Sequence, residues 1–505
     1  MKRAPTLLCL LAAGTAGCSG CDDDPGETTD ARDPDAGVSP DATVDAPLDA
    51  AGFYRSIPTT LNRNLDVLFV VDNSASMLAE QQQLAANFPQ FVDVLSQIEG
   101  GFPDIHIGIL SSDVGAAGQF GVPGCEAAGD DGNLLTGPPI NTCAQQFGLQ
   151  GAFISDIAQP DGARARNYTG DLAQLFTCMA SLGTTGCGFE MHLESMYRAL
   201  QPGKNPGFYR SGAHLAVVFV ADEDDCSTEL GVMFGDPNAG ISSQLGPRTS
   251  FRCHEFGVRC ENDPQPRALG PKTGCVPDPA SPYMYEVQRY IDFLRTLKDP
   301  SSNTTVSVAG ILGVFDPATG NLAVVPDIRT EDPNLPSVER SCIARDPGDP
   351  DDGATPPVRL QHFISAFPGH DALTSVCNDN LADAIIEIAG MLKTAIGNPC
   401  IDATLDDVDP NLPGLQPMCT VHDVVDPGGP GQMAIELPAC ETMFQTGGSC
   451  DAGSAATPCW CFLQDATSCP ASAQNPSSLA LGVTRGATPP PPPGSAVRLY
   501  CLAQP

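Results

Sequence analysis

Four short runs of almost continuously apolar residues constrain the fold of this chain more than any other feature of its sequence. They are 65–71, 105–110, 215–220 and 306–312. Runs of this length and β-branched content are typical of strands that are buried on both faces, as in parallel sheets. Apolar residues recur with helical spacing over 80–99, 170–182, 190–200, 285–298 and 380–396. This alternation of strand and helix predicts an α/β fold with a doubly wound, mostly parallel sheet.

The composition of the chain changes on both sides of this region. Residues 18–61 are rich in Asp, Ala and Pro and have few apolar side chains, which predicts a disordered tether. We expect the α/β domain to occupy 62–396, with two Gly- and Pro-containing insertions at 113–150 and 223–282. The last segment, 397–505, combines eight cysteines with short strand-like pieces, and it predicts a small Cys-rich β module.

The N-terminus has the pattern of an export signal. Residues 1–17 contain a basic start, a short apolar run and small residues, and the sequence Thr15-Ala16-Gly17-Cys18 resembles a bacterial lipobox. We expect Cys18 to be lipidated, with Cys21 as the less favoured anchor and a secreted protein cut nearby as the alternative. A lipid-anchored chain would be an outer-membrane or cell-surface lipoprotein, or would face the periplasm. The lipid would then be its only attachment to the membrane, because no later segment has the apolar length of a membrane helix.

Cysteine numbers support export independently. Ten cysteines lie between Cys125 and Cys377 and eight between Cys400 and Cys501. Even sets in an oxidising compartment predict disulfides, which we expect to pin both insertions. The chain lacks the two C-x-x-C pairs of a typical zinc site. Its 61 acidic and 25 basic residues also exclude nucleic acid as a plausible partner, because phosphates would be repelled.

The first apolar run ends in the sequence Asp72-Asn73-Ser74-Ala75-Ser76, and a helical pattern follows at once. Ligands of open α/β sheets bind at the carboxyl ends of the strands. The sequence matches the D-x-S-x-S motif and so resembles von Willebrand factor A (VWA) domains, whose metal-ion-dependent adhesion site usually holds Mg²⁺. The resemblance covers about 62–396. It implies that Asp72, Ser74 and Ser76 contribute to such a site.

The same resemblance extends to two further segments. It implies a metal-binding threonine in Gly183-Thr184-Thr185-Gly186, with Thr185 slightly preferred to Thr184, and a distal carboxylate at Asp222. Glu223 stands where the family commonly has Gly, which puts the local turn in doubt. Together, 186–190 and 222–227 are similar to segments of Cys-rich exported bacterial lipoproteins of this fold.

The residue types explain how such a site would bind. Mg²⁺ prefers octahedral oxygen ligands and keeps several waters; Ca²⁺ and Mn²⁺ are the alternatives. If hydroxyls supply the direct bonds, the charge of the ion is only partly neutralised, and an incoming Asp or Glu carboxylate completes its coordination. We therefore expect a protein partner that presents Asp or Glu. The oligomeric state is not predicted.

Enzyme motifs are missing from the sequence. His254-Glu255 has no second His at zincin spacing, and there is no G-x-S-x-G elbow and no Gly-rich phosphate loop with Lys. We expect a binding protein and not an enzyme. Two alternatives remain open: a structural envelope scaffold in which the metal only stabilises its own loop, and a hydrolase activity in the Cys-rich C-terminal part.

Overall fold

The computed structural model describes residues 52–503 with short gaps, the longest of which is 344–352. The predicted signal peptide, Cys18 and most of the predicted tether lie outside the described residues. The largest sheet has seven strands in the order β13-β10-β6-β2-β3-β4-β5. Four of them are the strands predicted from the apolar runs, and these positions are confirmed: β2 (Asn64–Val71), β3 (Asp104–Ser111), β6 (His214–Val220) and β10 (Val306–Leu312).

Three strands extend this sheet at its edges: β13 (Asp371–Ser375), β4 (Ile154–Ala158) and β5 (Arg164–Arg166). The pairs from β13 through β3 are parallel. In contrast, β4 pairs antiparallel with β3, and β5 antiparallel with β4. The sheet is therefore mixed.

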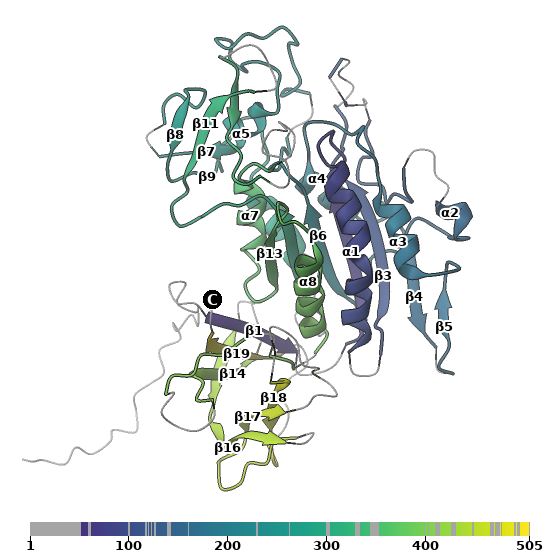
Figure 1. Ribbon diagram of the computed structural model, residues 1–505, viewed down its shortest axis with the longest axis vertical. Coiled ribbons are helices and arrows are strands. Elements are labelled where there is room, and N and C mark those ends of the chain that lie inside the picture. The colour runs from purple at the N-terminus through teal and green to yellow at the C-terminus, as the bar shows by residue number, and fades with distance from the viewer. Residues whose placement is uncertain are drawn as a thin grey trace, which may run out of the picture. The chain divides into compact units, whose positions relative to one another are not determined.

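Helices lie on both faces of the sheet (Figure 1). Side chains of alternate strand residues pack against them in two separate hydrophobic clusters. On one face, the ring of Phe69 in β2 contacts Phe88 and Phe176 at centroid distances of 6.2 and 4.9 Å. This face carries α1 (Leu78–Ser96), α3 (Leu172–Ala180) and α8 (Ala382–Ala395). The other face buries side chains of α4 (His192–Ala199), α6 (Val287–Thr296) and α7 (Val358–Ile364).

The prediction of a doubly wound, mostly parallel α/β fold is wrong. The structure is a β-rich mixture of parallel and antiparallel strands, because most strands outside the centre of the large sheet form four smaller sheets that pair mainly antiparallel. Several of those strands are only two or three residues long, so an apolar run could not reveal them.

The two predicted insertions are held by disulfides, as expected. Cys125–Cys187 and Cys143–Cys178 attach the first, and Cys226–Cys253 and Cys260–Cys275 the second. Short elements form within and after the insertions: α2 (Cys143–Gln146), α5 (Phe251–Gly257), β7 (Val258–Arg259), β8 (Gly270–Lys272), β9 (Val276–Pro277), β11 (Leu322–Pro326) and β12 (Pro336–Val338). Within the described residues, strands β12, β11 and β8 make one sheet and β7 and β9 another.

The C-terminal part is built from strands and disulfides. Its elements are β14 (Cys419–Val425), β15 (Met433–Leu437), β16 (Ala439–Thr446), β17 (Cys459–Gln464), β18 (Leu479–Thr484) and β19 (Ala496–Leu502). Its eight cysteines pair among themselves, while Trp460, Phe462 and Leu499 are buried in its core.

One strand of the C-terminal part comes from the other end of the chain. Strand β1 (Gly52–Pro58) pairs antiparallel with β19 throughout its length. The predicted boundary of the tether at residue 61 is therefore wrong, because residues 52–58 belong to a sheet. Their partner lies more than 400 residues away in sequence, and no local pattern reveals such a pairing.

The eighteen cysteines from Cys125 to Cys501 all form disulfides: the nine pairs include Cys342–Cys377 in addition to those above. Disulfides in this number are typical of proteins that fold outside the cytosol. In the part of the chain that the structure describes, no helix combines the length and the apolar character of a membrane span.

A buried histidine at the start of β6 makes stability depend on pH. His214 Nδ1 accepts a hydrogen bond from the Thr305 backbone N–H at 3.1 Å, and burial lowers the pKa of His214 to about 3. An unfolded histidine has a pKa near 6.5. The stability that the neutral, buried His214 contributes is therefore fully present above pH 6.5 and is lost as the pH falls towards 3. We expect His214 to lower the free energy of unfolding by about 2 kcal/mol between pH 6.5 and pH 5. Urea unfolding at several pH values should show a shallower decline for His214→Asn than for the wild type, and equal slopes would contradict this account.

Candidate functional site

Three loops meet at the carboxyl edge of the parallel strands. The loop after β2 begins at Asp72, whose N–H donates to Val220 O at 2.9 Å at the end of β6. The loop before α4 joins it through Gly186 N–H, which donates to Asn73 O at 2.8 Å. Gln81 of α1 also bridges both loops, because its Nε2 donates to the backbone oxygens of Asp72 and Gly183 at 2.8 and 2.9 Å. The predicted segments therefore converge.

Gly186 packs closely against the Asn73 side chain. A Cβ at this position would lie 2.0 Å from Asn73 Oδ1, so a larger residue would force the Asn73 side chain to move. Disulfides fix the chain beside the site on both sides, since Cys187 follows Gly186 and Cys226 follows the acidic segment after β6. Cys226 N–H also donates to Glu190 O at 2.7 Å.

Asp72, Ser74 and Ser76 form a tight turn. Asp72 Oδ1 accepts hydrogen bonds from Ser74 N–H at 2.7 Å and from Ser112 Oγ at 3.4 Å, as a carboxylate does in an Asx turn. The Oγ atoms of Ser74 and Ser76 are 3.3 Å apart. Asp72 Oδ2 is buried and has no hydrogen-bond partner among the described residues; His192 Nε2 lies 3.7 Å from it. The turn thus holds two hydroxyls and one carboxylate oxygen close together.

Asp222 reaches the same place from the end of β6. Its side chain is 6% exposed, and its Oδ1 has no hydrogen-bond partner in the described region. Burial raises the pKa of Asp222 well above its usual range, and the charges of Asp72 and Glu223 raise it further. A side-chain hydrogen bond with Ser76 acts in the opposite direction. Asp222 is therefore a neighbour of the D-x-S-x-S turn, as the sequence predicts.

Glu190 is a site residue that the sequence reasoning missed. It is buried just before α4. Burial raises the pKa of Glu190 well above its usual range, and the negative charges of Glu223 and Asp72 raise it further. The one available signal was an acidic residue in a Gly- and Cys-rich segment next to the predicted metal loop. Four carboxylates, those of Asp72, Glu190, Asp222 and Glu223, thus act on one another at this edge.

The predicted threonines lie on the loop that contacts Asn73. Thr184 is half-buried, whereas Thr185 is exposed. Neither side chain forms a hydrogen bond with another described residue.

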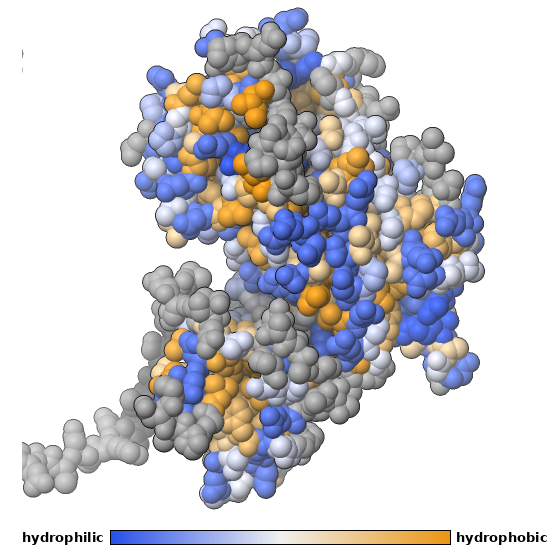
Figure 2. Space-filling model, in the orientation of Figure 1, coloured by the Kyte–Doolittle hydropathy of each residue, from blue (hydrophilic) through white to orange (hydrophobic). Residues whose placement is uncertain are grey.

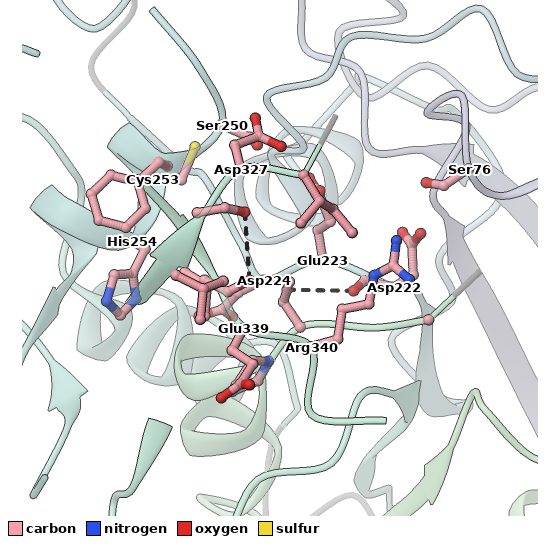
Figure 3. A pocket seen from close by; sticks show the side chains of 18 of the residues that line it. Ser76, Asp222, Glu223, Asp224, Ser250, Cys253, His254, Asp327, Glu339 and Arg340 are labelled. Carbon is pink, nitrogen blue, oxygen red and sulfur yellow. Dashed lines mark hydrogen bonds between the residues drawn. The ribbon is translucent and has the colours of Figure 1, made fainter. Parts of the chain in front are cut away.

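A cavity of about 480 Å³ opens beside the site. Figure 3 shows Ser76 and Asp222 at one side of it and Ser250, Cys253 and His254 at the other. The remaining wall comes from 325–328, 337–340 and the segment that leads to α7. The second insertion and the β11–β12 region therefore enclose space next to the convergent loops.

Comparison with protein-family models and with curated proteins found no match. Two solved structures are similar in part: the pilus adhesin SpaC of Lactobacillus rhamnosus GG, in an open conformation, and the pilus adhesin RrgA of Streptococcus pneumoniae. The first is 11% identical, with a TM-score of 0.29, covering 89% of this chain and 40% of that one. The second is 10% identical, with a TM-score of 0.21, covering 90% and 58%. The chain spans less than two thirds of either adhesin, and likenesses this weak carry no argument about its function.

The donor set suits a hard cation. Among the described residues, no three His, Cys, Asp or Glu side chains are grouped so that they could hold a metal by themselves. A cation at this edge would therefore need the serine hydroxyls in addition to carboxylates. Mg²⁺ and Ca²⁺ take oxygen ligands of these kinds, and either ion would offset the mutual repulsion of the buried carboxylates.

Proposed function

We propose that this chain is an exported surface or envelope protein that binds a partner protein through a divalent cation held by Asp72, Ser74, Ser76 and Asp222. One observation carries the proposal: two buried carboxylates, each with an oxygen lacking a partner among the described residues, converge on a pair of serine hydroxyls. Buried polar atoms without partners are costly unless a ligand satisfies them. The resemblance of 72–76 to the D-x-S-x-S motif supports the same assignment.

The proposed cation is Mg²⁺, with Ca²⁺ or Mn²⁺ as alternatives, and Thr185 or Thr184 would add a further hydroxyl. When bound, such an ion supplies a positive centre that accepts another oxygen ligand. Ser74 and Ser76 would hold it through neutral oxygens, and Asp72 would orient the turn through its hydrogen bond to Ser74 N–H. An Asp or Glu carboxylate of the partner then completes the coordination. This is a binding function, and we propose no catalytic step.

Membrane attachment belongs to the same proposal. Cys18 would carry a lipid, and the polar segment after it would hold the folded part away from the bilayer. The disulfides support export, because proteins of reducing compartments rarely contain so many.

Metal binding can be tested on the purified protein by calorimetry and by thermal unfolding with added MgCl₂. At a Mg²⁺ concentration 100 times the dissociation constant we expect about 2.7 kcal/mol of added stability. Ser74→Ala should weaken Mg²⁺ binding at least about tenfold, a loss of roughly 1.4 kcal/mol. The matched control is Ser96→Ala, at an exposed position of α1, which should bind Mg²⁺ like the wild type.

The partner requires a separate measurement. Capture of surface proteins in MgCl₂ should be lost in EDTA and in Ser74→Ala. A wild type that shows no response to Mg²⁺, Mn²⁺ or Ca²⁺ would refute the proposal. Normal metal binding with capture unchanged by Ser74→Ala would instead favour the scaffold, in which the metal stabilises only its own loop.

A further inference from the structure

The cavity beside the convergent loops has the properties of a specificity pocket. We propose that it binds the residues flanking the metal-bound carboxylate of the partner: an extended segment with one large apolar side chain and one Lys or Arg next to its acidic residue. This inference rests on the proposed function. It specifies which kind of peptide segment the proposed site would bind.

The position of the cavity makes it continuous with the site. Ser76 and Asp222 belong both to the convergent loops and to the cavity lining. A volume of about 480 Å³ lies within the roughly 300–1,000 Å³ of typical ligand pockets. A carboxylate bound at Asp222 would therefore bring its neighbouring residues into this space.

The far wall offers apolar surface. Ile328 is 72% exposed and Ile343 is 50% exposed, and both line the cavity. Figure 2 shows hydrophobic residues among hydrophilic ones at the surface over β8 and β11. Exposed apolar side chains gathered around a cavity are typical of a binding surface. This wall fits a large apolar side chain of the partner.

The charge of the lining indicates the second group. Six carboxylates line the cavity, whereas Arg340 is the one Lys or Arg among the described lining residues. The pKa values of Glu190 and Asp222 are raised, but Glu223, Asp327 and the exposed Glu339 add further negative charge to the lining. A free organic acid would be repelled by this lining, but a segment that also carries Lys or Arg would complement it.

Three synthetic peptides test the inference: Gly-Leu-Asp-Lys-Gly as the parent, the same peptide with Lys replaced by Glu, and the same with Leu replaced by Ser. Binding to the full chain is measured by fluorescence anisotropy in MgCl₂. The parent should bind at least about tenfold more tightly than either derivative, and Glu339→Lys should reduce the preference for Lys over Glu about tenfold. Asp93→Lys, which makes the same charge change at an exposed position of α1, should leave the preference intact.

Mg²⁺ calorimetry on the same proteins separates the two proposals. Glu339→Lys should bind Mg²⁺ as the wild type does. Normal Mg²⁺ binding, with equal or undetectable affinity for the three peptides, would overturn the specificity pocket and leave the metal site standing. If the wild type does not bind Mg²⁺, both proposals are overturned.

Discussion

Asp222→Asn is expected to make the metal-free protein more stable and to abolish its response to Mg²⁺. The Asp222 carboxyl is buried beside Asp72 and Glu223, so its charge destabilises the folded state when no cation is bound. Asparagine keeps the shape and removes the charge. We expect a gain in the free energy of unfolding in EDTA, because a carboxyl whose pKa is raised on folding destabilises the folded state at any pH above its unfolded pKa.

The opposite signs of the two effects make this variant informative. Urea unfolding in EDTA measures the gain, and the same measurement in MgCl₂ measures the lost response. Asp93→Asn on the exposed side of α1 serves as the control and should change neither. A metal-free Asp222→Asn protein that is less stable than the wild type would show that protein contacts stabilise the Asp222 carboxylate and that it does not need a cation.

The convergence of the predicted site follows from physics that is visible in the sequence. Asp72 and Asp222 each come directly after an apolar run, and carboxyl ends of neighbouring parallel strands meet at one edge. Strands β2 and β6 are such neighbours. The prediction of disulfides from the two even groups of cysteines is also confirmed. The cysteines of each group pair among themselves, and no disulfide joins one group to the other.

Other features depend on contacts between distant residues and left no local pattern. Strand β13 has one buried side chain, at Ala372, and its place in the sheet comes from pairing with β10. Helix α7 spans seven residues, too few for a periodic signal, although Arg359 and Phe363 are fully buried in it. The fold class was wrong because the four apolar runs describe the centre of one sheet, whereas most of the strands lie elsewhere.

Breaking the buried ion pair next to the site should cost more stability than any change considered above. Arg359 of α7 and Asp225 are both inaccessible to solvent, and Arg359 Nη2 lies 3.0 Å from Asp225 Oδ2. Arg359 also donates to Tyr285 O at 2.9 Å, and Asp225 Oδ1 accepts from Leu193 N–H at 2.9 Å at the start of α4. Removing one partner leaves a buried charge uncompensated, so Arg359→Met should lose about 3–5 kcal/mol in urea unfolding.

A double-mutant cycle distinguishes the ion pair from simple packing. Asp225→Asn alone should also be destabilising, but the double variant Asp225→Asn with Arg359→Met should lose less than the sum of the two, because no uncompensated charge remains. Strictly additive losses would mean that the two side chains do not act as a pair. Asp225 is three residues beyond Asp222 and fixes the start of α4, so each single variant should also bind Mg²⁺ more weakly. Under the proposed function, the cation site would then depend on a charge pair that contributes no ligand to it.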